Sequence, residues 1–139
     1  MKNTQTYRNQ HDEIGRASNE LTSVLVHGDA HAVRKSLGRL SSLIDVHLSL
    51  EDSSFYPALS RHADPEVRRI AKAYQESMGK LAAVYMDFRT RWLHMGAIEA
   101  DKSGFEKELR DLLRALEKRI DLENNTLYSM VDGLHGVAV

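Results

Sequence analysis

The chain has 139 residues, of which 42% are hydrophobic and 28% charged, values typical of one soluble globular domain spanning 1–139. Its net charge of −1, without a basic block, argues against nucleic-acid binding, and the lack of cysteine excludes disulfides and thiolate metal sites. No apolar run approaches the roughly 20 residues that span a membrane. Because the first ten residues are polar and resemble no secretory signal, we expect a cytoplasmic protein.

Four helices are predicted in chain order, and residues that end or cap a helix separate them. Gly28-Asp29 ends the first helix, and Asp29 can cap the second. Asp64-Pro65-Glu66 is a typical helix start, with a capping residue followed by proline and an acid. Pro57 should kink the second helix or end it early. The predicted helices cover about residues 4–26, 29–61, 64–96 and 102–131, and short loops between them favour an all-α, up-down-up-down antiparallel four-helix bundle.

The second predicted helix carries polar residues on an otherwise apolar seam. Its apolar positions recur at alternating steps of four and three, the rhythm of a helix packed against partner helices. His47 and Glu51 fall where leucines would be expected. The full series is Val33, Leu37, Leu40, Ile44, His47, Glu51, Ser54 and Ala58.

The fourth predicted helix repeats this arrangement, and Glu123 is the only charge on its seam. A buried ionised carboxylate costs several kcal/mol unless it is paired or bound to a metal. The interior must therefore contain a group that compensates it. The series is Leu109, Leu113, Leu116, Ile120, Glu123, Leu127 and Met130.

Antiparallel packing would bring these residues to one layer. At about 1.5 Å per residue, four side chains from three helices lie roughly 10 to 21 Å from the end of the bundle that holds the turn at 61–64. They are His11, His47, Glu51 and Glu123. Two imidazoles and two carboxylates on facing helices are typical of a non-haem iron or manganese site.

Three segments in this order resemble the hemerythrin-like (HHE cation-binding) proteins. Residues 10–14 (QHDEI) resemble the first-helix histidine segment of that family. Residues 47–57 (HLSLEDSSFYP) resemble its second-helix motif, and residues 119–128 (RIDLENNTLY) its fourth-helix motif. The resemblance covers nearly the whole chain.

This resemblance implies a four-helix bundle with a carboxylate-bridged di-iron centre. Such proteins bind oxygen, sense oxygen or nitric oxide, or handle iron, and the role implied here is that of a binding protein rather than an enzyme. By the resemblance, His11, His47, Glu51 and Glu123 match ligand positions. The implied cofactor is non-haem iron, one or two ions, with oxygen or nitric oxide as partners.

The chain also departs from the family pattern. Arg119 stands where the family has a histidine four residues before the glutamate, and the third helix offers Tyr74, Ser77 and Met78 in place of histidines. Several nitrogen ligands of a complete di-iron site are thus missing. Arginine stays protonated, so Arg119 could replace the second cation and hold the carboxylates by bidentate hydrogen bonds. A single metal would then have Tyr74 or water completing its ligand shell.

Two metal-free alternatives remain open. In one, Arg119 pairs with Glu51 and Glu123, and the histidines hydrogen-bond to these carboxylates. In the other, the chain is a helical interaction module with a protein partner, because residues 115–123 (ALEKRIDLE) faintly resemble the last helix of bacterial regulator-of-sigma-D proteins. Tyr56 and Tyr128 follow the two acidic motifs and could lie over the site, although helix-end packing is the favoured interpretation. His27, His31 and His94 could form a surface metal site, but a solvated loop cluster is favoured.

Overall fold

The computed structural model describes residues 4–134 and 137–139, and these residues form helices and connections without any strand. The all-helical prediction is confirmed. Two of the long helical paths change from α to π hydrogen bonding partway along. The elements are α1 (Gln5–His27), α2 (Ala30–Leu50), η1 (Glu51–Phe55), α3 (Tyr56–Ser60), α4 (Pro65–Trp92), α5 (Ala97–Ala100), α6 (Lys102–Leu122), η2 (Glu123–Leu127) and α7 (Tyr128–Asp132).

Short polar side chains set where the long helices begin. Asp29 accepts a hydrogen bond from the backbone N–H of Ala32 at 2.9 Å, and so caps α2 as predicted. Asp64 caps α4 in the same way, with Pro65 as the first helical residue. Within the described residues, no helix is long and apolar enough to cross a membrane.

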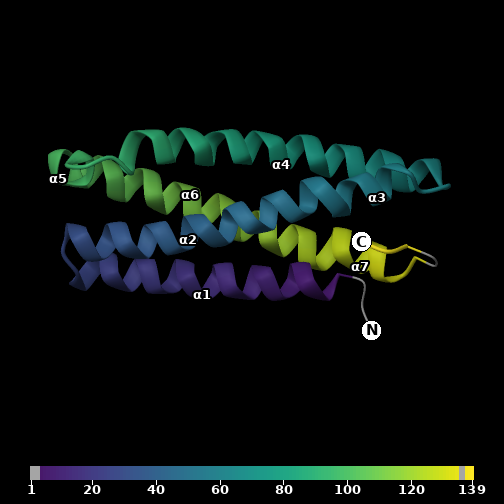
Figure 1. Ribbon diagram of the computed structural model, residues 1–139, viewed down its shortest axis with the longest axis horizontal. Helices are drawn as coiled ribbons and strands as arrows, with labels where there is room; N and C mark the ends of the chain where they lie inside the picture. The colour runs from purple at the N-terminus through teal and green to yellow at the C-terminus, as the bar shows by residue number, and fades with distance from the viewer. Residues whose placement is uncertain (1–3, 135–136) are drawn as a thin grey trace.

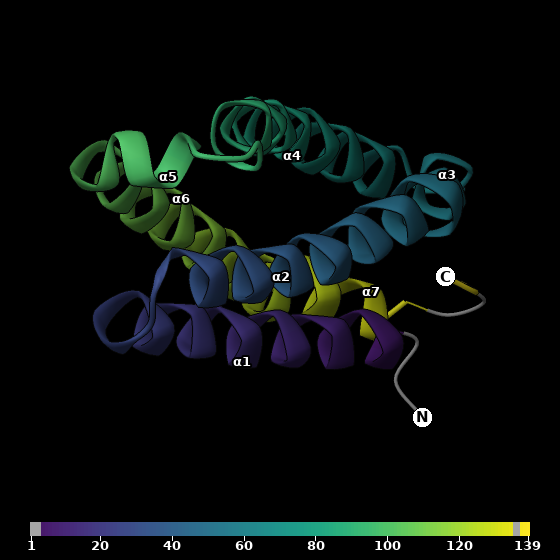
Figure 2. The same cartoon turned by 60° about the vertical axis from the view of Figure 1, so that its left-hand side comes forward.

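The four long helical paths lie side by side along the long axis (Figure 1). α1 packs most extensively against α2, and α4 packs against α6. Figure 2 shows α4 set off from the α1–α2 pair, to which it is tied by the ion pair of Arg89 with Asp45, 3.0 Å. Thr4 Oγ1 donates to Asp132 Oδ1 at 2.8 Å, so the start of α1 is joined to the end of α7.

The core consists of two hydrophobic clusters along the bundle. The larger one contains Ile14 of α1, Ile44 of α2 and Leu116 of α6. The smaller one is aromatic and includes Tyr7 of α1 and Phe55 of η1. The polar residues predicted to converge lie, along the sequence, between members of the larger cluster and members of the smaller one.

The two π-helical segments correct the predicted seams. In each, a backbone N–H donates to the carbonyl five residues earlier, from Tyr56 to Glu51 and from Tyr128 to Glu123. Such a turn contains one residue more than an α-turn and rotates everything beyond it. Phe55 is consequently fully buried (0% exposed), whereas Ser54, which the heptad placed in the seam, is only half-buried.

The π-segment also explains why Pro57 does not end the second helix. Pro57 lies in the first turn of α3, directly after the change in hydrogen bonding. A proline is tolerated in a first turn because its missing N–H needs no partner there. The helical path therefore continues to Ser60, close to the predicted end.

Deleting Ser53, an exposed residue inside η1, should convert this segment to regular α-helix while Phe55 keeps facing the core, because the deletion removes the extra residue of the π-turn. Pro57 would then lie inside a continuous α-helix, where its ring clashes with the carbonyl group four residues earlier and leaves that carbonyl without a donor. We expect a loss of about 3 kcal/mol or more in the free energy of unfolding, measured by denaturant titration. Deletion of Met95, which is 87% exposed in the connection between α4 and α5, is the control and should have a much smaller effect. Equal losses in the two variants would contradict the role given to η1.

Candidate metal centre

The four residues predicted to converge do meet inside the bundle. His11 comes from the middle of α1 and His47 from the last turn of α2. Glu51 and Glu123 are the first residues of the two π-segments η1 and η2. Their exposed fractions are only 1 to 3%, so the group is enclosed by protein.

The two histidines face one another through their Nε2 atoms, which are 3.0 Å apart. The other nitrogen of each ring is held by an amide: His11 Nδ1 donates to Asn124 Oδ1 and His47 Nδ1 to Gln10 Oε1, each at 2.8 Å. A ring whose Nδ1 carries the proton presents a lone pair at Nε2, the arrangement by which metal-binding histidines are oriented. Both lone pairs point into the same small space.

Carboxylate oxygens point into that space as well. Glu51 Oε1 lies 3.0 Å from His47 Nε2, and Glu123 Oε1 lies 3.2 Å from His11 Nε2. Ligand atoms of His11, His47 and Glu123 all fall within 4.8 Å of one another. Glu51 Oε1 has no hydrogen-bond partner among the described residues, although it is buried. The donor set thus has more lone pairs than hydrogens and fits a cation at its centre.

Burial shifts the protonation of these groups in opposite directions. It raises the pKa of the Glu51 and Glu123 carboxyls. Burial and the neighbouring His11 lower the pKa of His47 to about 4. Burial also disfavours charge on His11. The hydrogen bond to Glu123, the negative charge of that carboxylate and the hydrogen bond to Asn124 outweigh this effect, so the pKa of His11 is raised. Without a metal ion, a proton on His11 partly compensates the carboxylates.

Two tyrosines brace the carboxylates crosswise. Tyr128, which follows η2, donates from Oη to Glu51 Oε2 of η1 at 2.9 Å. Tyr56, which follows η1, donates to Glu123 Oε2 of η2 at 3.3 Å. Burial raises the pKa of both phenols, so they remain hydrogen-bond donors. Both rings also belong to the smaller hydrophobic cluster, so these tyrosines pack near the helix ends as expected and hold the carboxylates in addition.

A sequence signal for these tyrosines exists in the form of an internal repeat. Glu51 and Tyr56 recur as Glu123 and Tyr128, each 72 positions later, since 123 − 51 and 128 − 56 both equal 72. In this alignment His47 corresponds to Arg119. The two halves of the chain therefore supply equivalent carboxylates and phenols but differ in one nitrogen-bearing side chain.

Arg119 is buried (7% exposed) but does not bind the carboxylates as expected. Its guanidinium donates to the carbonyl oxygen of Tyr74 at 2.7 Å and to Ser77 Oγ at 3.2 Å, both on α4. The Tyr74 ring lies beneath it, 4.9 Å from the guanidinium carbon. Only Nε approaches Glu123, 4.0 Å from Oε2. The predicted bidentate hydrogen bonds are wrong, because the guanidinium NH2 groups are directed to α4.

The described residues contain one cluster of three or more side chains spaced to hold a metal ion, and it is this one. His27, His31 and His94 do not belong to it and are exposed. Tyr74 serves as a support for Arg119. The tyrosine hydroxyls that donate to the candidate ligands are those of Tyr56 and Tyr128.

Comparison with known proteins gives one family match. The hemerythrin HHE cation binding domain matches residues 3–131, nearly the whole chain. No curated protein sequence and no solved structure shows significant similarity to it.

Replacing Tyr128 by phenylalanine should leave the buried Glu51 carboxylate without the phenol that donates to it. We expect the free energy of unfolding of chelator-treated protein to fall by about 1–3 kcal/mol. Tyr56→Phe is the matched control, since its bond to Glu123 is longer, and its loss should be smaller. The reverse order in chemical denaturation would contradict the crosswise bracing.

Proposed function

Because the chain belongs to the hemerythrin HHE cation-binding domain family, we propose that it binds a single iron ion through His11, His47, Glu51 and Glu123. We further propose that the four long helical paths form an up-down-up-down antiparallel bundle around this centre. Bound iron would supply open coordination positions to which a small ligand can add. The protein's contribution is to orient the ring nitrogens and to keep bulk water away from them.

One observation supports metal binding above the others: Glu51 is only 1% exposed, and its buried Oε1 atom accepts no hydrogen bond among the described residues. A buried carboxylate oxygen without a donor costs free energy that folding must supply. The facing lone pairs of His11 and His47 add to this cost. A cation that contacts all of these atoms would remove both penalties together.

The proposed limit of one ion rests on Arg119. This residue occupies the position that the internal repeat relates to His47, and it carries a permanent positive charge. Its guanidinium is anchored on α4 by Tyr74 and Ser77. A fixed cation beside Glu123 replaces the charge of a second metal ion and repels one that approaches.

We propose a role in binding oxygen or nitric oxide, or in handling iron, rather than in catalysis. His11, His47 and the two glutamates can occupy four of six octahedral positions, which leaves room for a small ligand. Their exposure of 1 to 3% favours a ligand of diatomic size over a larger substrate. A cytoplasmic location remains a prediction.

Protein purified from iron-supplemented culture should contain close to one iron per chain, measured by elemental analysis. Glu123→Leu should abolish uptake because it removes a central oxygen donor. Glu76→Leu is the matched control, since Glu76 is exposed on α4 and its loss should leave iron content unchanged.

Two results would contradict this proposal. Absence of iron from the wild-type protein, with Glu123→Leu as stable or more stable, would favour the metal-free alternative, because an apolar residue would then only remove a buried charge. Two ions per chain would contradict the role of Arg119.

Metal affinity should rise with pH, because a metal ion must displace the proton that His11 holds. Burial opposes charge on His11, but the hydrogen bond to Glu123 and the charge of that carboxylate raise the pKa of His11, so without metal its ring holds a proton to higher pH than a free imidazole does. His47, with a pKa of about 4, contributes no further proton there. We expect affinity to increase by about tenfold per pH unit below the pKa of His11. Calorimetry in buffers of different ionisation enthalpy would detect the released proton, and a pH-independent affinity would contradict this.

A further inference from the structure

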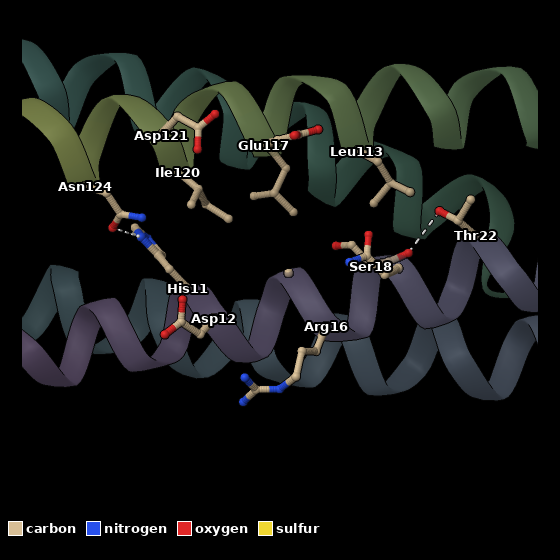
Figure 3. A pocket seen from close by; sticks show the side chains of 13 residues that line it. His11, Asp12, Arg16, Ser18, Thr22, Leu113, Glu117, Ile120, Asp121 and Asn124 are labelled. Carbon is tan, nitrogen blue, oxygen red and sulfur yellow. Dashed lines mark hydrogen bonds between the residues drawn. The ribbon is translucent and has the colours of Figure 1, made fainter.

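A cleft of ≈ 520 Å³ separates α1 from α6 (Figure 3). The α1 wall includes two small residues, Gly15 and Ser18. The α6 wall combines apolar residues such as Leu113 and Ile120 with acidic ones. The cleft exists because small residues on α1 leave the space between the two helices unfilled.

One end of this cleft is formed by the metal centre itself. His11 and Asn124 lie there together, joined by the 2.8 Å hydrogen bond between them (Figure 3). The Nε2 atom of His11 is on the inner side, where it faces His47 and Glu123. A solute in the cleft is therefore separated from the donor atoms by little more than the His11–Asn124 pair.

Charges around the cleft favour a cation. Three exposed carboxylates border it, those of Asp12, Glu117 and Asp121, against one guanidinium, that of Arg16. A cleft with excess negative charge raises the local concentration of cations and their rate of association. Asp12 is adjacent to His11 in the sequence.

We propose that the α1–α6 cleft is the route by which a hydrated divalent cation reaches the centre. The inference rests on the proposed function, since it requires that the centre binds metal. Carboxylate and amide oxygens, the ligands that hydrated cations accept most readily, mark the path from Asp12 and Asp121 to Asn124. The path ends at His11, whose Nε2 faces His47, and the centre behind it includes Glu51 Oε1, a buried acceptor without a hydrogen-bond partner among the described residues.

Filling the cleft at Gly15 tests this route directly. A Cβ added at Gly15 would meet no atom within 4 Å, so a side chain can start at this position without displacing the backbone, and phenylalanine is chosen to fill the cleft that Gly15 lines. Gly38 on α2 is the matched control, because it is also half-buried, helical and free of neighbours within 4 Å, but does not line this cleft. Both substitutions replace glycine inside a helix and should not weaken it.

Cobalt(II) uptake by chelator-treated protein, followed by stopped-flow absorbance, provides the rate. Gly15→Phe should slow association by roughly tenfold or more, since a blocked path requires local opening of the bundle. Its cobalt content at equilibrium should equal that of the wild type. Gly38→Phe should take up cobalt at the wild-type rate. Uptake by Gly15→Phe at the wild-type rate would overturn the route.

Other outcomes separate this inference from the proposed function. If the wild-type protein binds no cobalt at equilibrium, both proposals are overturned. If Gly15→Phe takes up cobalt normally but binds nitric oxide slowly once loaded with iron, the cleft admits the gas and not the metal ion, and the proposal is wrong.

A second variant avoids dependence on the folding of Gly15→Phe. Asp12→Asn combined with Asp121→Asn should slow cobalt association by about threefold or more at low salt, and the difference should shrink as salt is added. Glu76→Gln, an exposed charge removal on α4, is the control and should leave the rate unchanged. An unchanged rate in the double variant would also overturn the cation route.

Discussion

The structure depends on one electrostatic constraint: two carboxylates and two imidazoles meet in a layer that bulk water does not reach. Glu51, Glu123, His11 and His47 are each 1 to 3% exposed. Their facing atoms are mostly acceptors, and the available protons are too few to satisfy them. A cation is the group that compensates such a set, whether a metal ion or, in its absence, the proton that the raised pKa of His11 retains.

At both carboxylates the backbone changes from α-helical to π-helical hydrogen bonding, and this change supports the buried layer. Glu51 and Glu123 each open a π-helical segment, and the extra residue turns the following tyrosine inward. Tyr56 and Tyr128 then donate across the bundle, each to the carboxylate of the other segment. Irregular helical turns of this kind are frequent at functional sites, where the backbone geometry serves the side chains.

The internal repeat makes the difference between the two halves informative. Equivalent positions hold His47, which faces the centre, and Arg119, whose NH2 groups are bound to α4. In the proposed centre the half with His47 would provide a ligand, and the half with Arg119 provides a fixed charge in its place. We propose a single metal ion because of this asymmetry, and the α1 side, where the cleft ends at His11, is the proposed side of uptake.

The sequence by itself determined the helices, their capping residues and the polar positions on the seams, because helix periodicity and capping are local properties of the chain. His11, His47, Glu51 and Glu123 could be found in this way, since they interrupt regular apolar rows. The heptad rhythm placed Leu127 correctly, but it failed beyond Glu51, where a π-turn puts Phe55 rather than Ser54 in the core. It also gave no indication that Tyr56 and Tyr128 donate to the carboxylates. Only the tertiary structure decided which way the buried Arg119 points, because its partners come from α4, more than 40 residues away in the sequence.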